Sequence, residues 1–175
     1  MVKAGEHVRE PDRPAQAGPV ARLQLVAGRV AVRGANLLRP RLSLGVRLVA
    51  LDDAGRVLLV RHSYLPGLHL PGGAVDAGES CRMAVEREAR EEGALELPQP
   101  PEMFRIYWNH ALGRRDHVVL FVARGVGSAA GAKPRFPEIL EARFHAADAL
   151  PEDVTEATRQ RLAEVLEGAA PSETW

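Results

Sequence analysis

Three glutamates in the middle of the chain have a spacing that suits metal-assisted chemistry. Glu88, Glu91 and Glu92 lie three and four positions apart, so an α-helix with 3.6 residues per turn places their carboxylates on one face. Carboxylates that share a face repel one another unless a cation neutralises them. Oxygen-only ligands favour a hard divalent cation, Mg²⁺ or Mn²⁺, and Mg²⁺ readily takes substrate phosphate oxygens as further ligands. The pattern therefore indicates a site for a divalent cation.

The rest of this helical face argues against a solvated acidic surface. Toward the N-terminus the same face carries small or apolar residues, Cys81, Ala84 and Val85. Arg87 and Arg90 are expected to lie off the face, with Arg90 on the opposite side beside Glu86. The carboxylates therefore continue a buried face, and we expect Cys81 to be a packing residue rather than a nucleophile.

The loop ahead of this helix is rich in glycine. Pro71, Gly72 and Gly73 exclude a regular strand or helix interior, and the glycines allow the backbone to approach a ligand closely. A helix N-terminus that follows such a loop presents free N–H groups to anions. Pro-Gly-Gly by itself also suits an ordinary turn. Ser80 is a good N-cap and Gly93 a good stop, so the predicted helix covers residues 80–93.

The elements around the loop and helix follow from apolar runs and turn residues. Residues 42–51 and 56–61 predict two strands joined as a hairpin by the turn at 52–55. Further strands are predicted at 104–108 and 117–124. A final amphipathic helix is predicted at 152–168, with Leu162, Val165 and Leu166 on one face.

The glutamate helix and its loop together resemble a known motif. Gly73, then Glu79, then Arg87-Glu88-Ala89 and Glu91-Glu92 resemble the Nudix box, which here spans residues 73–95 and ends at Leu95. The resemblance covers about residues 40–168. It implies an α/β fold, a Nudix-type α/β/α sandwich with a mixed sheet between helices. One departure is visible, because the family has glycine where this chain has Ala94, and we expect Gly93 to shift the helix stop by one residue.

The resemblance also implies an activity and roles for particular residues. The activity is metal-dependent hydrolysis of a phosphoanhydride bond in a nucleoside diphosphate linked to another moiety. The implied metal ligands are the carbonyl of Gly73 and the carboxylates of Glu88, Glu91 and Glu92. Glu88 is either a ligand or the base that deprotonates the attacking water, and Glu79 pairs with Arg87 to tie the loop to the helix. The family often adds a catalytic carboxylate from a later loop, for which Glu138 is the first candidate and Glu141 the second.

Substrate-binding residues are harder to predict, because they lie outside the box. The candidates are Arg61, Arg114, Arg115 and Tyr107. Arg114 and Arg115 precede an apolar strand and offer planar N–H forks to phosphate, although a solvated hairpin turn would look the same. Tyr107 and Trp108 could stack on a base, but on an alternating strand only one of them faces a given side.

The overall composition limits which kinds of partner are expected. The chain has 175 residues with zero formal net charge and one cysteine, so neither a disulfide nor a nucleic-acid partner is expected. No apolar run is long enough to span a membrane, and we expect a cytoplasmic protein. The partner is a small-molecule phosphoanhydride substrate, and a homodimer is compatible with the sequence.

The chain is expected to have two parts, a basic, partly flexible extension at 1–38 and a Nudix hydrolase domain at 39–170. The extension either leads into the first strand or touches a membrane surface or partner. A non-catalytic nucleotide-binding module of the same fold is the alternative function. Such modules usually lose one or more of the glutamates of the box, whereas this chain keeps Glu79, Glu88, Glu91 and Glu92.

Overall fold

The computed structural model describes residues 43–109, 116–129, 131 and 133–175. All of them belong to the second of two units in the chain, Arg41–Trp175. The predicted extension at 1–38, with both of its interpretations, lies outside the described residues, as do Arg114 and Arg115.

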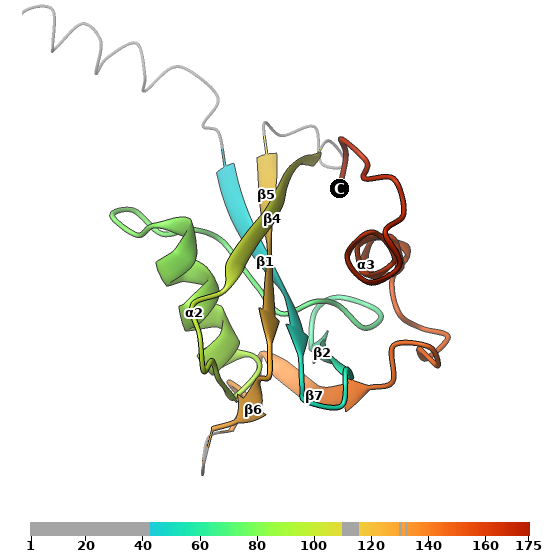
Figure 1. Cartoon of the computed structure of the whole chain (residues 1–175). Helices are drawn as coiled ribbons and strands as arrows, with labels where there is room; N and C mark the ends of the chain where they lie inside the picture. The colour runs from blue at the N-terminus through green and yellow to red at the C-terminus, as the bar shows by residue number, and fades with distance from the viewer. Residues whose placement is uncertain (1–42, 110–115, 130, 132) are drawn as a thin grey trace, which may run out of the picture. The chain divides into compact units, whose positions relative to one another are not determined.

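A mixed five-stranded sheet forms the centre of the second unit, with strand order β4-β5-β1-β2-β7 (Figure 1). Its strands are β1 (Ser43–Leu51), β2 (Val57–His62), β4 (Glu102–Asn109), β5 (Asp116–Arg124) and β7 (Ile139–His145). β1 and β5 are parallel over their whole length, whereas the other neighbouring pairs are antiparallel. Two short strands, β3 (Leu95–Glu96) and β6 (Gly127–Ser128), pair separately.

The four predicted strands are confirmed with boundaries that move by at most two residues. The predicted hairpin is also present, since β1 and β2 are antiparallel and the Asp52 carboxylate accepts hydrogen bonds from the backbone N–H of Ala54 and Arg56 at 3.0 and 2.8 Å. β7 was not predicted. Its sequence, Ile-Leu-Glu-Ala-Arg-Phe-His, is only half buried and lacks a clean alternation of apolar and polar residues.

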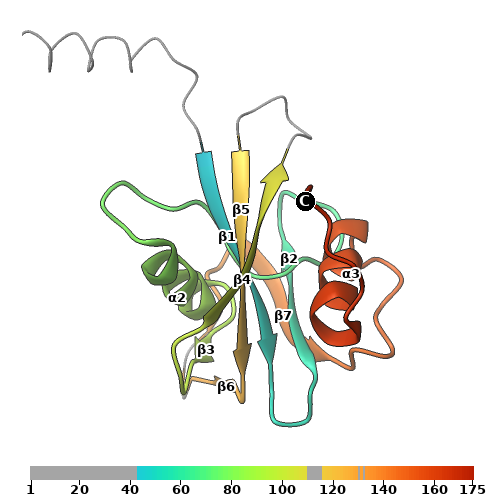
Figure 2. The ribbon, with the colours of Figure 1, turned by 45° about the horizontal axis from the view of Figure 1, so that its top comes forward.

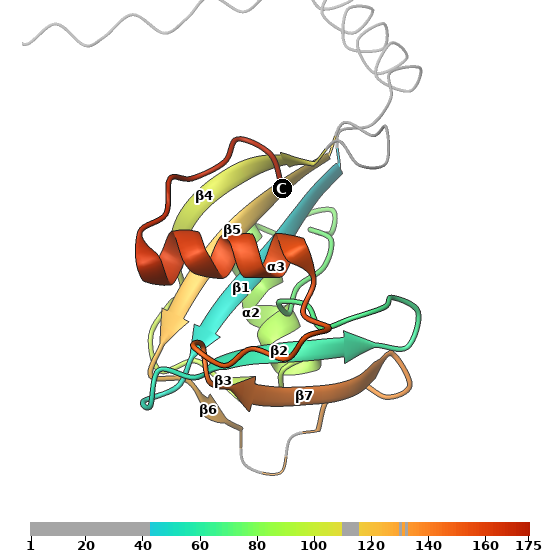
Figure 3. The same ribbon diagram turned by 90° about the vertical axis from the view of Figure 1, so that its right-hand side faces the viewer.

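Helices cover both faces of the sheet, as Figures 2 and 3 show, and the α/β class is confirmed. The first helix, α2 (Cys81–Glu91), packs on one face over a core that includes Val46, Leu48, Val60 and Val119. The helix on the other face, α3 (Glu156–Leu162) continued by η1 (Ala163–Glu167), packs over a second core. Alternation along each strand divides its side chains between the two cores, so neighbouring residues serve opposite faces.

The glutamate helix α2 begins and ends close to its predicted limits. The Ser80 hydroxyl accepts a hydrogen bond from Met83 N at 3.2 Å, which makes Ser80 the predicted N-cap. The expectation that Gly93 shifts the stop is wrong, because Ala94 has a left-handed φ of 50° and Gly93 does not. The turn therefore falls where the family has glycine, and here an alanine adopts this unfavourable conformation.

The C-terminal helix differs more from its prediction. It begins at Glu156 rather than at residue 152, because the segment after Pro151 makes a turn and Thr155 takes the N-cap position. Leu162 is buried as predicted, but Leu166 is 37% exposed, and Arg161 and Glu164 are buried instead. Arg161 donates to Glu164 at 2.7 Å, so the two buried charges compensate each other. The pattern of apolar residues could not reveal this pair.

Within the described residues, no helix is long and apolar enough to span a membrane.

Candidate metal centre

The glycine loop is held against β1 by regular backbone hydrogen bonds. Leu48 N donates to Pro71 O at 3.0 Å, and Val46 N donates to Gly73 O at 2.9 Å. Gly72 has a φ of +146°, and a Cβ atom there would lie 2.1 Å from Val46 O. Only glycine fits this position, because both its backbone conformation and its contact with β1 exclude a side chain.

Gly72 connects the loop directly to Glu92, one of the three box glutamates. Gly72 N donates to Glu92 Oε2 at 2.7 Å, and Glu92 is 5% exposed. Burial raises the pKa of Glu92 to about 7, although the hydrogen bond from Gly72 and the nearby Arg47 act in the opposite direction. His62 Nδ1 lies 3.6 Å from Glu92 Oε1, and burial lowers the pKa of His62 to about 4. Near neutral pH, therefore, the histidine is uncharged and leaves the carboxylate without a full counter-charge.

Glu88 lies on the same side of the loop. It is 8% exposed, and burial raises its pKa against the opposing effect of Arg87. A Cβ atom on Gly73 would lie 2.5 Å from Glu88 Oε1, so Gly73 leaves the room that this carboxylate occupies. Its own carbonyl, the implied ligand, accepts the hydrogen bond from Val46 N.

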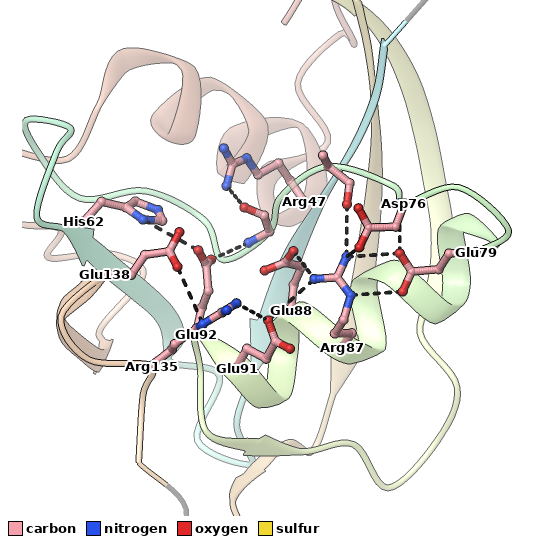
Figure 4. A network of polar contacts seen from close by, with 12 residues as sticks. Arg47, His62, Asp76, Glu79, Arg87, Glu88, Glu91, Glu92, Arg135 and Glu138 are labelled. Atoms are coloured by element: carbon pink, nitrogen blue, oxygen red, sulfur yellow. Dashed lines mark hydrogen bonds and ion pairs between the residues drawn. The ribbon is translucent and has the colours of Figure 1, made fainter.

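Arg87 links the loop, the start of α2 and the glutamate face (Figure 4). Arg87 Nε and Nη2 each donate to the Glu79 carboxylate at 3.0 Å, and Nη2 also donates to Ala74 O at 3.0 Å. The structure thus places the implied Glu79–Arg87 pair in direct contact. The expectation that Arg87 lies off the glutamate face is wrong, because its Nη1 donates to Glu88 Oε1 at 2.5 Å. A long side chain at the border of a helical face can bend onto it.

The third box glutamate, Glu91, is the most accessible of the three, and a later loop reaches it. Arg135 Nη1 donates to Glu91 Oε2 at 3.0 Å, and Arg135 Nε lies 3.9 Å from Glu138 Oε2. Tyr64 donates from its hydroxyl to Glu138 Oε1 at 3.2 Å. In Figure 4, Glu138 points toward the Glu92 and His62 end of the cluster. The structure thus brings the first-choice later carboxylate beside the box.

Three other predicted site residues lie elsewhere or make other contacts. Tyr107 is fully buried in the core under α3, and its hydroxyl donates to Glu164 at 2.6 Å, so the prediction that it contacts substrate is wrong. Arg61 and Glu141 pair with each other at 3.4 Å. The Arg61 side chain also contacts Asp153 at 2.8 Å, which leaves it little freedom to bind an anion. Arg61 follows Val57 and Leu59 by alternation along β2, and those two residues belong to the core under α3, on the side of the sheet away from α2.

Two arginines, Arg47 and Arg135, lie here although their sequence spacing gave no sign of it. Gly72, expected to let the backbone approach a ligand, donates its N–H to Glu92, and His62 lies beside the same carboxylate. Arg47, His62 and Arg135 come from segments distant from α2, and only the tertiary fold brings them to it.

The residues present fit a hard divalent cation, although they are not gathered into a finished site. The donors are oxygen atoms only, and two of the carboxylates are buried with raised pKa values, which is the environment that a cation would stabilise. In the part of the chain that the structure describes, no three acidic, histidine or cysteine side chains are grouped closely enough to hold a metal ion. Arg87 and Arg135 instead neutralise Glu88 and Glu91.

A comparison with protein families matches a NUDIX domain to residues 41–166. The chain belongs to the Nudix family. The predicted family and the predicted class of enzyme, a hydrolase acting on phosphoanhydride bonds, are therefore confirmed.

Solved structures agree with this assignment. A MutT NUDIX hydrolase from Burkholderia pseudomallei is 27% identical, with a TM-score of 0.60 over 71% of this chain and 98% of that chain. An ADP-ribose pyrophosphatase from Streptococcus suis is 25% identical, with a TM-score of 0.54 over 78% of this chain and 96% of that chain. A NUDIX hydrolase from Nitrosomonas europaea shares the fold at 23% identity, with a TM-score of 0.62 over 73% and 90%. No curated protein matches the chain.

Proposed function

We propose that this chain is a Mg²⁺- or Mn²⁺-dependent hydrolase of a phosphoanhydride bond in a nucleoside diphosphate linked to another moiety. The observation that carries the proposal is the pair of carboxylates, Glu88 and Glu92, buried beside the glycine loop, of which Glu92 has only the uncharged His62 as an ion-pair partner. Two desolvated carboxylates on one helical face are costly in the apo protein, and a divalent cation removes that cost.

Glu88, Glu91 and Glu92 would hold the cation. When bound, such a cation neutralises phosphate charge and lowers the pKa of water. Glu79 and Arg87 do not need to contact the substrate. Their double hydrogen bond fixes the start of α2 to the glycine loop, and this keeps Glu88 beside Gly73.

A base is needed to take the proton from the attacking water. Glu88 and Glu138 are the two candidates, and each has a feature in its favour. Burial raises the pKa of Glu88 toward the range of a general base, whereas Glu138 is on a separate loop and lies near Glu92. A pH profile separates them, because loss of the base removes the acidic limb of kcat/KM, whereas loss of a ligand shifts the metal requirement.

The partner is a small diphosphate compound. The Streptococcus suis neighbour is named an ADP-ribose pyrophosphatase, and this name makes ADP-ribose a first compound to test here. Tyr64 replaces Tyr107 as the aromatic candidate for stacking on a base, because its side chain is 61% exposed and hydrogen-bonds Glu138 beside the cluster. The single cysteine is compatible with the reducing cytoplasm, which we propose as the location.

The test is a panel of ADP-ribose, nucleotide sugars, dinucleoside polyphosphates and nucleoside triphosphates, with Mg²⁺, Mn²⁺ or EDTA, read by phosphate or pyrophosphate release. We expect turnover of at least one compound that depends on metal and falls by at least a hundredfold in Glu88→Gln and Glu92→Gln. Glu138→Gln and Glu141→Gln form a matched pair, since only Glu138 lies at the site, and we expect loss of rate for the first alone. Metal-dependent binding without turnover of any compound would contradict the proposal and favour the binding module.

A further inference from the structure

Arg47 is a charged residue in a strand that is otherwise apolar. Between Val46 and Leu51, all residues of β1 except Arg47 are buried and hydrophobic. Alternation puts Arg47 on the same side of the sheet as Val49 and Leu51, away from α2. Arg47 is itself only partly buried, but a guanidinium among these apolar residues still costs desolvation energy, so its position requires a reason.

The hydrogen bonds of Arg47 use only one of its nitrogen atoms. Nη1 donates to Leu70 O at 3.2 Å and to Gly72 O. Among the described residues, Nε and Nη2 make no hydrogen bond, and no carboxylate lies within ion-pair distance of the guanidinium. Two neutral carbonyls thus position the side chain, while its positive charge has no anionic partner.

The location of this charge relates it to the candidate metal centre. Gly72 bridges the two, since its carbonyl accepts from Arg47 and its N–H donates to Glu92. Figure 4 shows Arg47 on the opposite side of the loop from Glu88 and Glu92. Those carboxylates are near enough to raise the pKa of Arg47, although burial has the larger effect and lowers it.

Arg47 differs in this respect from the other cations around the site. Arg87 is held by Glu79 and Glu88, and Arg135 by Glu91. Arg61, on the same face as Arg47, is paired with Glu141 and Asp153. Of these four arginines, only Arg47 has donors available and no carboxylate partner among the described residues.

We propose that Arg47 binds the phosphate of the substrate that is not attacked, on the far side of the glycine loop from the carboxylates. The inference rests on the proposed function, because it assigns the second phosphate of the same diphosphate substrate. The free Nε–H and Nη2–H form a planar fork that matches two phosphate oxygens, and the incoming anion supplies the counter-charge that the protein lacks. Arg47 then takes the role that the sequence analysis had assigned to Arg61, Arg114 or Arg115.

The test compares two non-hydrolysable probes, methylenediphosphonate and methylphosphonate, by calorimetric titration at fixed free Mg²⁺. We expect the wild type to prefer the diphosphonate, and Arg47→Gln to lose ten- to a hundredfold of that preference. Arg47→Lys keeps the charge but not the fork and should lose part of the preference. Arg143→Gln, which removes an arginine whose side chain is 72% exposed on β7, is the control and should behave as the wild type.

Three results would overturn the inference. The first is a preference for diphosphonate in Arg47→Gln within about twofold of the wild type. The second is an equal weakening of Mg²⁺ binding measured without phosphonate, which would show that Arg47 acts only by holding the loop. The third is an Arg47→Gln variant that does not fold, together with an Arg47→Lys variant that keeps the full preference. Failure of the proposed function itself would look different, because the wild type would then bind neither probe in a metal-dependent way.

Discussion

Replacement of Glu92 by glutamine tests whether the carboxylate cluster is kept for a cation rather than for stability. In the metal-free protein Glu92 is 5% exposed and has a pKa of about 7, above its ordinary value of 4.5. The folded state therefore binds a proton more tightly than the unfolded state. As pH rises from about 4.5 to about 7 the carboxyl loses this proton, and the free energy of unfolding falls.

The size of the effect follows from the two pKa values. The difference between 4.5 and about 7 corresponds to at most about 3 kcal/mol at pH 8. Glutamine keeps an oxygen that can accept the hydrogen bond from Gly72 N, but it carries no charge at any pH. We expect Glu92→Gln to be about 1–3 kcal/mol more stable than the wild type at pH 8 and equally stable below about pH 4.5, in EDTA.

The assay is thermal or urea unfolding of both proteins from pH 4 to 8.5, in EDTA and then with Mg²⁺. A gain of 2 kcal/mol would raise Tm by roughly 5–10 °C. Mg²⁺ at a hundred times Kd should remove most or all of this difference, because the wild type gains about 3 kcal/mol and the variant gains less. A variant that is less stable than the wild type at pH 8 in EDTA, or that gains as much from Mg²⁺, would refute the reasoning.

The remaining predictions concern the residues around the cluster. Ala94→Gly should raise the free energy of unfolding by about 0.5–1 kcal/mol, since it relieves the left-handed φ, and an unchanged or lower urea midpoint would contradict this. Tyr107→Phe should cost about 1.5–3 kcal/mol of stability through the lost hydrogen bond to Glu164 but leave KM within twofold, and a larger change in KM would restore Tyr107 as a substrate contact. Arg87→Lys loses the double hydrogen bond to Glu79 and should lower stability by about 1–2 kcal/mol in urea unfolding at pH 7, an effect that Glu79→Gln should reduce in the double variant.

The sequence determined the parts of this protein that depend on local spacing. The start of α2, its Ser80 N-cap and the shared face of Glu88, Glu91 and Glu92 all follow from a period of 3.6 residues and from capping chemistry. The strands β1, β2 and β5 follow in the same way from continuous apolar runs. Periodicity could not anticipate Arg161 and Glu164, because each is polar alone and becomes a buried residue only in contact with the other.

Only the tertiary structure decided which distant residues meet the glutamate helix. His62 and Glu138 reach Glu92 because β2 pairs with β7, and Arg47 reaches the glycine loop because that loop hydrogen-bonds to β1. The structure also decided between Tyr107 and Trp108, which alternation left open, by burying the tyrosine under α3. Such contacts depend on strand order and on which face each position serves. Neither is encoded in the spacing of nearby residues, since both result from the packing of the whole sheet against its two helices.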